Sequence, residues 1–137
     1  MAQPRRRDTV PEVVEIPGQR ALRGIIHAGA LVALADGTVD AAERQALLAF
    51  LRHNGLLTRY GRRATLALVH QATNMPAAGR LAALCEAADA LAPLSRSAAS
   101  PLIARAARQV MLADGVAWPQ EVAMVRVIED RLGLSQG

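Results

Sequence analysis

The chain has 137 residues, a length that suits a single domain with one core. Hydrophobic residues make up 52% of the chain, which excludes a protein too polar to form a core. Aromatic residues make up only 2%, so the core must come from Leu, Ile, Val and Ala. The formal net charge of +4 comes with arginine and no lysine, and this mild excess permits an acidic partner without requiring one.

The first 18 residues carry charges and prolines and show no apolar period. They predict a loose N-terminal arm, residues 1–18, ahead of a helical domain over residues 19–137. From residue 19 to residue 35, apolar residues cover most sides of a helix, which is typical of a helix at the centre of its domain. Gly37 predicts the end of this helix, because glycine is common just past a helix C-terminus.

Asp40 predicts the start of a second helix. Glu43 follows three positions later, and this spacing is typical of a capping box, in which each side chain accepts a hydrogen bond from a free backbone N–H. The apolar pattern then predicts further helices over residues 60–72 and 76–91.

Ser100 and Pro101 predict the next helix start, with a capping hydroxyl followed by proline at the first helical position. This helix is expected over residues 101–113 and the last one over residues 119–132, and a short helical stretch between residues 93 and 99 also fits. The prediction is an all-α protein, a single compact helical domain of about six to seven helices.

Two stretches of the chain match each other: "LADGTVDAAE" at Leu34–Glu43 and "LADGVAWPQE" at Leu112–Glu121. Each follows an apolar helix, places Ala-Asp-Gly at the corner, has a Glu seven positions after the Asp, and continues as an amphipathic helix. We interpret them as two related helix–turn–helix hairpins that arose by internal duplication.

The acidic residues of the two corners are candidates for a metal site. Asp36 and Glu43 can face one corner, Asp114 and Glu121 can face the other, and Asp40 lies beside the first pair. If the hairpins pack with approximate two-fold symmetry, these carboxylates converge, and like charges held together need a cation or water between them. Oxygen ligands suit calcium or magnesium rather than zinc.

The same residues have a structural alternative. Glu43 and Glu121 stand where a carboxylate caps a helix start. Asp36 lies near a helix C-terminus, where the helix dipole disfavours a negative charge, so a cation, an arginine from elsewhere or a hydrogen bond into the loop must compensate. The second corner departs from the first, since Trp118 replaces Asp40 and cannot cap a helix.

Taken together, "ALVALADGTVDAAE" and "ARQVMLADGVAWPQE" resemble the paired corners of the tellurite-resistance TerB family and its TerB-like relatives. The resemblance covers roughly residues 20–134. It implies an all-helical cytoplasmic bacterial protein, acidic residues that bind a divalent metal, and a role in a stress response or as a module in larger assemblies. The positions that match the family pattern are Asp36, Glu43, Asp114 and Glu121, with Asp40 as an addition.

Two further sets of residues are candidates for partner binding. One set consists of three arginines beside Tyr60, namely Arg59, Arg62 and Arg63. These arginines could make weak contact with nucleic-acid phosphates, but the interpretation we favour is a solvated helix start. Nucleic acid is therefore not the expected partner. Trp118 marks a contact with a protein partner if it is exposed and plugs the hairpin junction if it is buried, and the interpretation we favour is partial burial, because a large ring beside the corner can cover it. A homo-oligomer also fits.

No motif of catalysis is found in the sequence: it has no Gly-rich phosphate loop, no Gly-x-Ser-x-Gly and no His-Glu-x-x-His, which predicts a non-enzymatic protein. Cys85 is the single cysteine, which fits a reducing cytoplasm. The longest apolar run, residues 25–35, is shorter than the roughly 20 residues of a bilayer span, so we expect a cytoplasmic protein without a membrane span.

Overall fold

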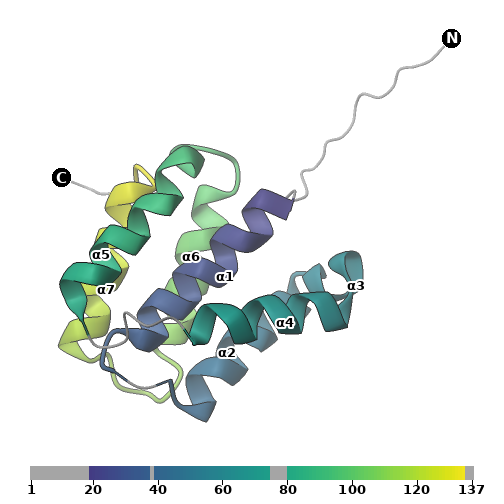
Figure 1. The fold of residues 1–137 in the computed structure, drawn as a ribbon, viewed down its shortest axis with the longest axis horizontal. Helices are drawn as coiled ribbons and strands as arrows, with labels where there is room; N and C mark the ends of the chain where they lie inside the picture. The colour runs from purple at the N-terminus through teal and green to yellow at the C-terminus, as the bar shows by residue number, and fades with distance from the viewer. Residues whose placement is uncertain (1–18, 38, 75–79, 135–137) are drawn as a thin grey trace, which may run out of the picture.

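The computed structural model describes residues 19–37, 39–74 and 80–134, and within these ranges the chain has seven α-helices, one 3-10 helix and no strand (Figure 1). The predicted all-α class is therefore confirmed, whereas the predicted arm, residues 1–18, lies outside the described residues. The elements in chain order are α1 (Gln19–Leu34), α2 (Ala41–His53), α3 (Leu56–Tyr60), α4 (Arg62–Thr73), α5 (Leu81–Ala87), the 3-10 helix η2 (Ala88–Leu94), α6 (Ser100–Met111) and α7 (Pro119–Arg131).

Helix α1 lies at the centre of the domain, as its apolar pattern predicted. It packs against α6 most extensively and also against α4, η2, α7 and α2. Figure 1 shows α1 and α6 in the middle, with α5 and α7 on one side and α2, α3 and α4 on the other. The residues of α1 that are not buried are Gln19, Arg20, Arg23 and His27. None of the described helices is both long and apolar enough to cross a bilayer.

The core is built from aliphatic side chains of all the helices, as the shortage of aromatic residues requires. Close packing of α1 against α2 depends on Gly29, where an added Cβ would lie 2.7 Å from Cδ1 of Leu47. The largest side chains with almost no solvent exposure are Leu22, Ile25, Leu31, Leu47, Leu51, Leu56, Leu84, Leu91, Ile103, Met124, Ile128 and Leu132.

The middle of the chain differs from the prediction. The five-residue helix α3 was not predicted, because a helix this short shows no apolar period. The helix expected over residues 76–91 is observed as α5 followed by η2, and residues 75–79 lie outside the described part of the chain. Pro93 lies inside η2, and proline lacks the N–H that an α-helix interior requires.

Two leucines that belong to the apolar pattern of the sequence are exposed, Leu81 by 43% and Leu112 by 57%. Leu81 is the first residue of α5 and Leu112 follows the last residue of α6, so the chain turns away at both positions. Ser100 also differs from its predicted capping role, because it is the first helical residue and its hydroxyl donates to the Leu94 carbonyl at 2.8 Å.

Candidate metal centre

The first corner joins α1 to α2. After α1 ends, Gly37 takes a φ of 104°, a conformation that favours glycine, and its N–H donates to the Leu34 carbonyl at 3.0 Å. Asp40 then caps α2: its Oδ1 accepts from the Glu43 N–H at 2.9 Å, and Oε1 of Glu43 accepts from the Asp40 N–H at 3.2 Å. The predicted capping box is present, and it orients the Glu43 carboxyl group towards the corner.

The second corner joins α6 to α7 and has a different local structure. Trp118 occupies the position before α7 and makes no side-chain capping hydrogen bond, so the second corner lacks the capping box. Asp114 instead accepts two hydrogen bonds within its own loop, from the Val116 N–H at 3.1 Å and from the Trp118 indole Nε1 at 3.2 Å. The two corners are therefore related in sequence but not equivalent in structure.

Three of the five predicted acidic side chains meet. One carboxylate oxygen from each of Asp36, Glu43 and Glu121 lies within 4.8 Å of the other two, so the two corners do face each other. Asp36 is exposed, whereas Glu43 is 2% exposed and Glu121 is 0% exposed. We call these three residues the acidic cluster. Asp40 and Asp114 lie outside the cluster, each engaged in hydrogen bonds of its own loop.

Glu121 has an unusual environment for a carboxyl group. Both of its side-chain oxygens are buried and have no hydrogen-bond partner among the described residues. No ion pair is observed between a described arginine and Glu121 or Glu43, and Arg108 and Arg131 pair with other acids. A buried carboxylate without a partner is costly, so such a group either takes up a proton or binds a cation.

The carboxyl groups of the cluster are perturbed accordingly. Burial, reinforced by the neighbouring Glu121 carboxyl group, raises the pKa of Glu43 to about 9. Burial also raises the pKa of Glu121, and the negative charge of Asp36 adds to this effect. At the second corner, hydrogen bonds from the Val116 N–H and then the Trp118 indole lower the pKa of Asp114. Glu43 is therefore protonated at neutral pH unless a cation displaces the proton.

The donor set suits a hard cation. Carboxylate oxygens at three positions are the ligands that calcium and magnesium prefer, and no histidine or cysteine joins the cluster to favour zinc. Asp36 is exposed and so opens the buried pair towards solvent. The residues present therefore fit a divalent cation, which would remove the repulsion between the three carboxylates.

The residues predicted to bind partners lie elsewhere or at the edge of the cluster. Arg59, Arg62 and Arg63 are exposed around the start of α4, away from the Asp-Gly corners (Figure 1), and the Arg59 guanidinium lies 5.8 Å from the centre of the Tyr60 ring. Trp118 is 45% exposed, so it does not plug the hairpin junction.

Comparison with known proteins places the chain in a family. The family described as "Tellurite resistance protein TerB" matches residues 23–137, which include both corners and the whole acidic cluster. The chain belongs to the TerB family. No curated protein and no solved structure matched this TerB domain. The family assignment, which the paired Ala-Asp-Gly corners predicted, therefore rests on the family match, and the all-helical structure is consistent with it.

Proposed function

We propose that this TerB domain binds a divalent cation, calcium or magnesium, at Asp36, Glu43 and Glu121. The observation that carries the proposal is the pair of buried Glu121 oxygens, which have no hydrogen-bond partner and face two further carboxyl groups. Capping alone accounts for Glu43, whose carboxyl group accepts from the Asp40 N–H, but no capping hydrogen bond is made by either buried oxygen of Glu121.

Bound there, a cation joins three helix ends. Asp36 follows the end of α1, Glu43 lies in the first turn of α2 and Glu121 lies in the first turn of α7. A cation shared by the three therefore ties the first hairpin to the second and stabilises the corner between them. We propose that the domain acts in this way as a non-enzymatic module in the cytoplasm, in a stress response or within a larger assembly.

A second candidate function is binding of a protein partner at the second corner, with the acids serving only the fold. Leu112, Val116 and Trp118 are all large apolar residues and are 57%, 45% and 45% exposed. They lie on one short segment beside the acidic cluster, which is an arrangement typical of a contact surface for a protein or for a second copy of the chain.

The test is a calorimetric titration of the full chain with calcium and with magnesium, compared with Glu121→Gln. The substitution keeps the shape of the side chain and removes its charge. We expect saturable binding and a cation-dependent rise in Tm for the native chain, and binding at least about tenfold weaker for the variant. Glu86→Gln is the matched control, since Glu86 is an exposed acid of α5 outside the cluster.

Equal titration curves for the native chain and Glu121→Gln, or no heat and no rise in Tm in either, would contradict cation binding at the cluster. In that case the acids are structural, and the second candidate is tested by the oligomeric state and by substitution of Trp118. Binding of single-stranded DNA that weakens steeply with salt and depends on Arg59, Arg62 and Arg63 would instead support the nucleic-acid alternative.

A further inference from the structure

A second site candidate lies at the other end of α1. Three of the residues of this helix that are not buried are Arg20, Arg23 and His27. Their spacing places them on one face of the helix together with Gly24. Gly24 precedes Asp36 by twelve positions, which corresponds to about 18 Å along a helix axis. This face of α1 is therefore separate from the acidic cluster.

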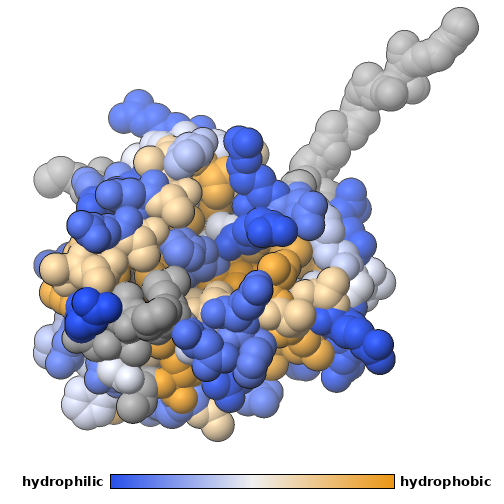
Figure 2. All heavy atoms as spheres, in the orientation of Figure 1, coloured by the Kyte–Doolittle hydropathy of each residue, from blue (hydrophilic) through white to orange (hydrophobic). Residues whose placement is uncertain are grey.

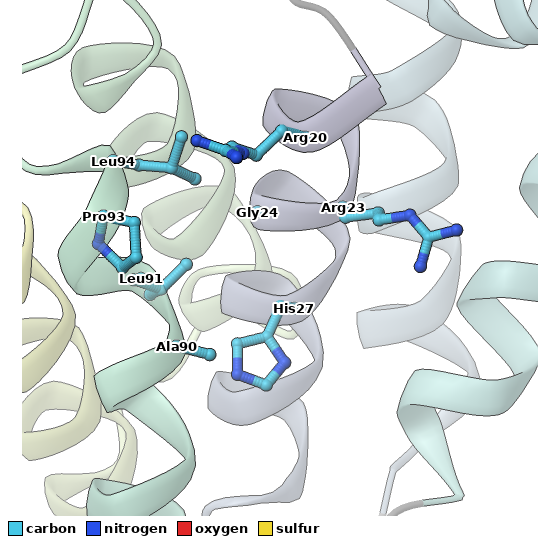
Figure 3. A pocket seen from close by; sticks show the side chains of 8 residues that line it. All are labelled: Arg20, Arg23, Gly24, His27, Ala90, Leu91, Pro93 and Leu94. Atoms are coloured by element: carbon cyan, nitrogen blue, oxygen red, sulfur yellow. The ribbon is translucent and has the colours of Figure 1, made fainter.

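A cavity of about 360 Å³ lies between this face of α1 and η2, and it is lined by residues of both elements (Figure 3). Leu91 and Leu94 of η2 form its apolar wall. Figure 3 shows the Arg20 side chain reaching towards Leu94, and the His27 ring lying in the gap between α1 and Ala90. The volume lies at the lower end of the roughly 300–1,000 Å³ typical of small-molecule sites.

Gly24 allows the two elements to approach closely. An added Cβ at this position would lie 2.7 Å from Cδ1 of Leu94 and 3.0 Å from Cδ1 of Ile103. The glycine therefore lets η2 lie directly against α1 on the inner side of the cavity, while Arg20 remains at its outer side. In the space-filling view of the same face, apolar surface is visible between hydrophilic side chains (Figure 2).

The charged residues among the described lining of the cavity are both basic. Arg20 and Arg23 both line it, no acidic residue in the described part of the chain does, and neither guanidinium forms an ion pair with a described residue. Arg23 also lines a neighbouring cavity of about 310 Å³ towards α4, and its side chain points that way in Figure 3. The unpaired Arg20 guanidinium beside the apolar wall favours a ligand with an anionic head, because arginine binds carboxylate and phosphate in a bidentate manner.

His27 adds a further polar group to the cavity. Its Nε2 lies 2.7 Å from the carbonyl oxygen of Ala87, and a carbonyl can only accept, so Nε2 carries the hydrogen. On the neutral ring, Nδ1 is then a hydrogen-bond acceptor that no described residue uses. The bond to Ala87 fixes the ring in the cavity rather than leaving it free to rotate.

We infer that this cavity binds a small amphipathic anion, with a carboxylate or phosphate head held by Arg20 and a short apolar chain lying against Leu91 and Leu94. The apolar wall, the absence of acids among the described residues of the lining and the Arg20 guanidinium without an ion pair all match this class of ligand. The inference is independent of the cation site and concerns a different part of the protein.

The test is an NMR titration of the full chain with octanoate in the presence of EDTA, which keeps the cation site out of the measurement. Ala90→Trp is the blocking variant, because Ala90 is exposed and lines the cavity. Ala92→Trp is its matched control, since Ala92 is an exposed residue of the same 3-10 helix that does not line the cavity. We expect saturable shifts around α1 and η2 in the native chain and in Ala92→Trp, and their loss in Ala90→Trp.

The role of the head group is tested with the variant Arg20→Gln and with neutral octanol. Both changes are expected to weaken binding at least about tenfold relative to octanoate on the native chain, whereas Arg126→Gln, an exposed arginine of α7, leaves it unchanged. Octyl phosphate in place of octanoate shows which head group binds more tightly. Equal binding of octanol and octanoate, or equal binding to Ala90→Trp and Ala92→Trp, would overturn the inference.

Discussion

Glu43 and Glu121 each lie in the first turn of a different helix, yet the two buried side chains have carboxylate oxygens within 4.8 Å of each other. Neither forms an ion pair with a described arginine. Two buried carboxyl groups at this separation cannot both be ionised without a large cost, so the stability of the fold should depend on pH and on divalent cations.

In the absence of divalent cations, we expect the free energy of unfolding to fall as pH rises from about 5 to 9. The folded chain holds the Glu43 proton up to a pKa of about 9, whereas the ordinary value for the unfolded chain is 4.5. The folded state therefore binds more protons in this window, and the stabilisation present below pH 4.5 is lost as pH rises through 9. One such group contributes a slope of at most about 1.4 kcal/mol per pH unit.

Urea unfolding in EDTA at several pH values measures this slope, and Glu43→Gln is expected to reduce it. Asp114 serves as an internal control, because its lowered pKa acts in the opposite sense: its stabilisation is present at higher pH and is lost only as pH falls through the lowered value. It therefore contributes nothing to the change between pH 5 and 9. Unfolding free energies that rise or stay level over this range in the native chain would contradict the protonated pair.

The two corner aspartates are expected to differ in their effect on cation binding. Asp36→Asn removes a member of the acidic cluster and should weaken calcium or magnesium binding by about tenfold or more. Asp114→Asn removes a carboxylate that is bonded to Val116 and Trp118, and should weaken binding by about threefold or less through its longer-range charge alone. Calorimetry on both variants checks the order, and a larger loss for Asp114→Asn would contradict it.

The capping box at the first corner gives a prediction about stability. Asp40→Ala removes the acceptor for the Glu43 N–H and should lower the free energy of unfolding by about 1 kcal/mol. Asp40→Ser keeps a capping oxygen and should cost much less. Denaturant unfolding of the two variants, at a saturating and at zero cation concentration, separates the cap from any effect on the metal. Equal losses in both variants would mean that the cap contributes little.

The contact of Gly29 with Leu47 gives a prediction about packing. In Gly29→Ala, the new methyl group would lie 2.7 Å from Cδ1, 3.2 Å from Cδ2 and 3.4 Å from Cγ of Leu47, a side chain that is only 1% exposed. This clash should outweigh the better helix propensity of alanine, with a net loss of about 1–2 kcal/mol in the free energy of unfolding.

The double variant Gly29→Ala/Leu47→Ala supplies the control for that prediction. Removing the Leu47 side chain relieves the clash, so the two substitutions should be non-additive, with the pair less destabilising than the sum of the single effects. Strict additivity in denaturant unfolding would show that Leu47 repacks freely around the new methyl group.

Much of the geometry of the candidate metal centre could be predicted, because it follows from short sequence patterns at the two corners. The spacing of Asp40 and Glu43 predicted the capping box, and the repeated Ala-Asp-Gly corner predicted that acids from both halves of the chain meet, as Asp36 and Glu121 do. The orientation of Asp114 could not be predicted, because it depends on where the Trp118 indole lies once the loop has folded. The same spacing of acids therefore led to different environments at the two corners.

The fold was least predictable where an element is short or where burial depends on a distant neighbour. Helix α3 has five residues and no readable period, and Leu112 lies just past a helix end, where the chain direction changes. Arg20, Arg23 and His27 were not predicted as a site from the sequence, and the wall of the cavity comes from η2, far along the chain. The period of apolar residues identifies the buried face of a helix, but it does not identify the element that packs against that face.

Trp118 is the chain's one tryptophan, and its indole donates to Asp114 at the second corner, three positions before Glu121. The natural fluorescence of this protein therefore comes mainly from one known place beside the acidic cluster. A change of emission without a change in far-UV circular dichroism reports an event at this corner, and a change in both reports unfolding. The unlabelled chain thus carries its own optical reporter where the two hairpins meet.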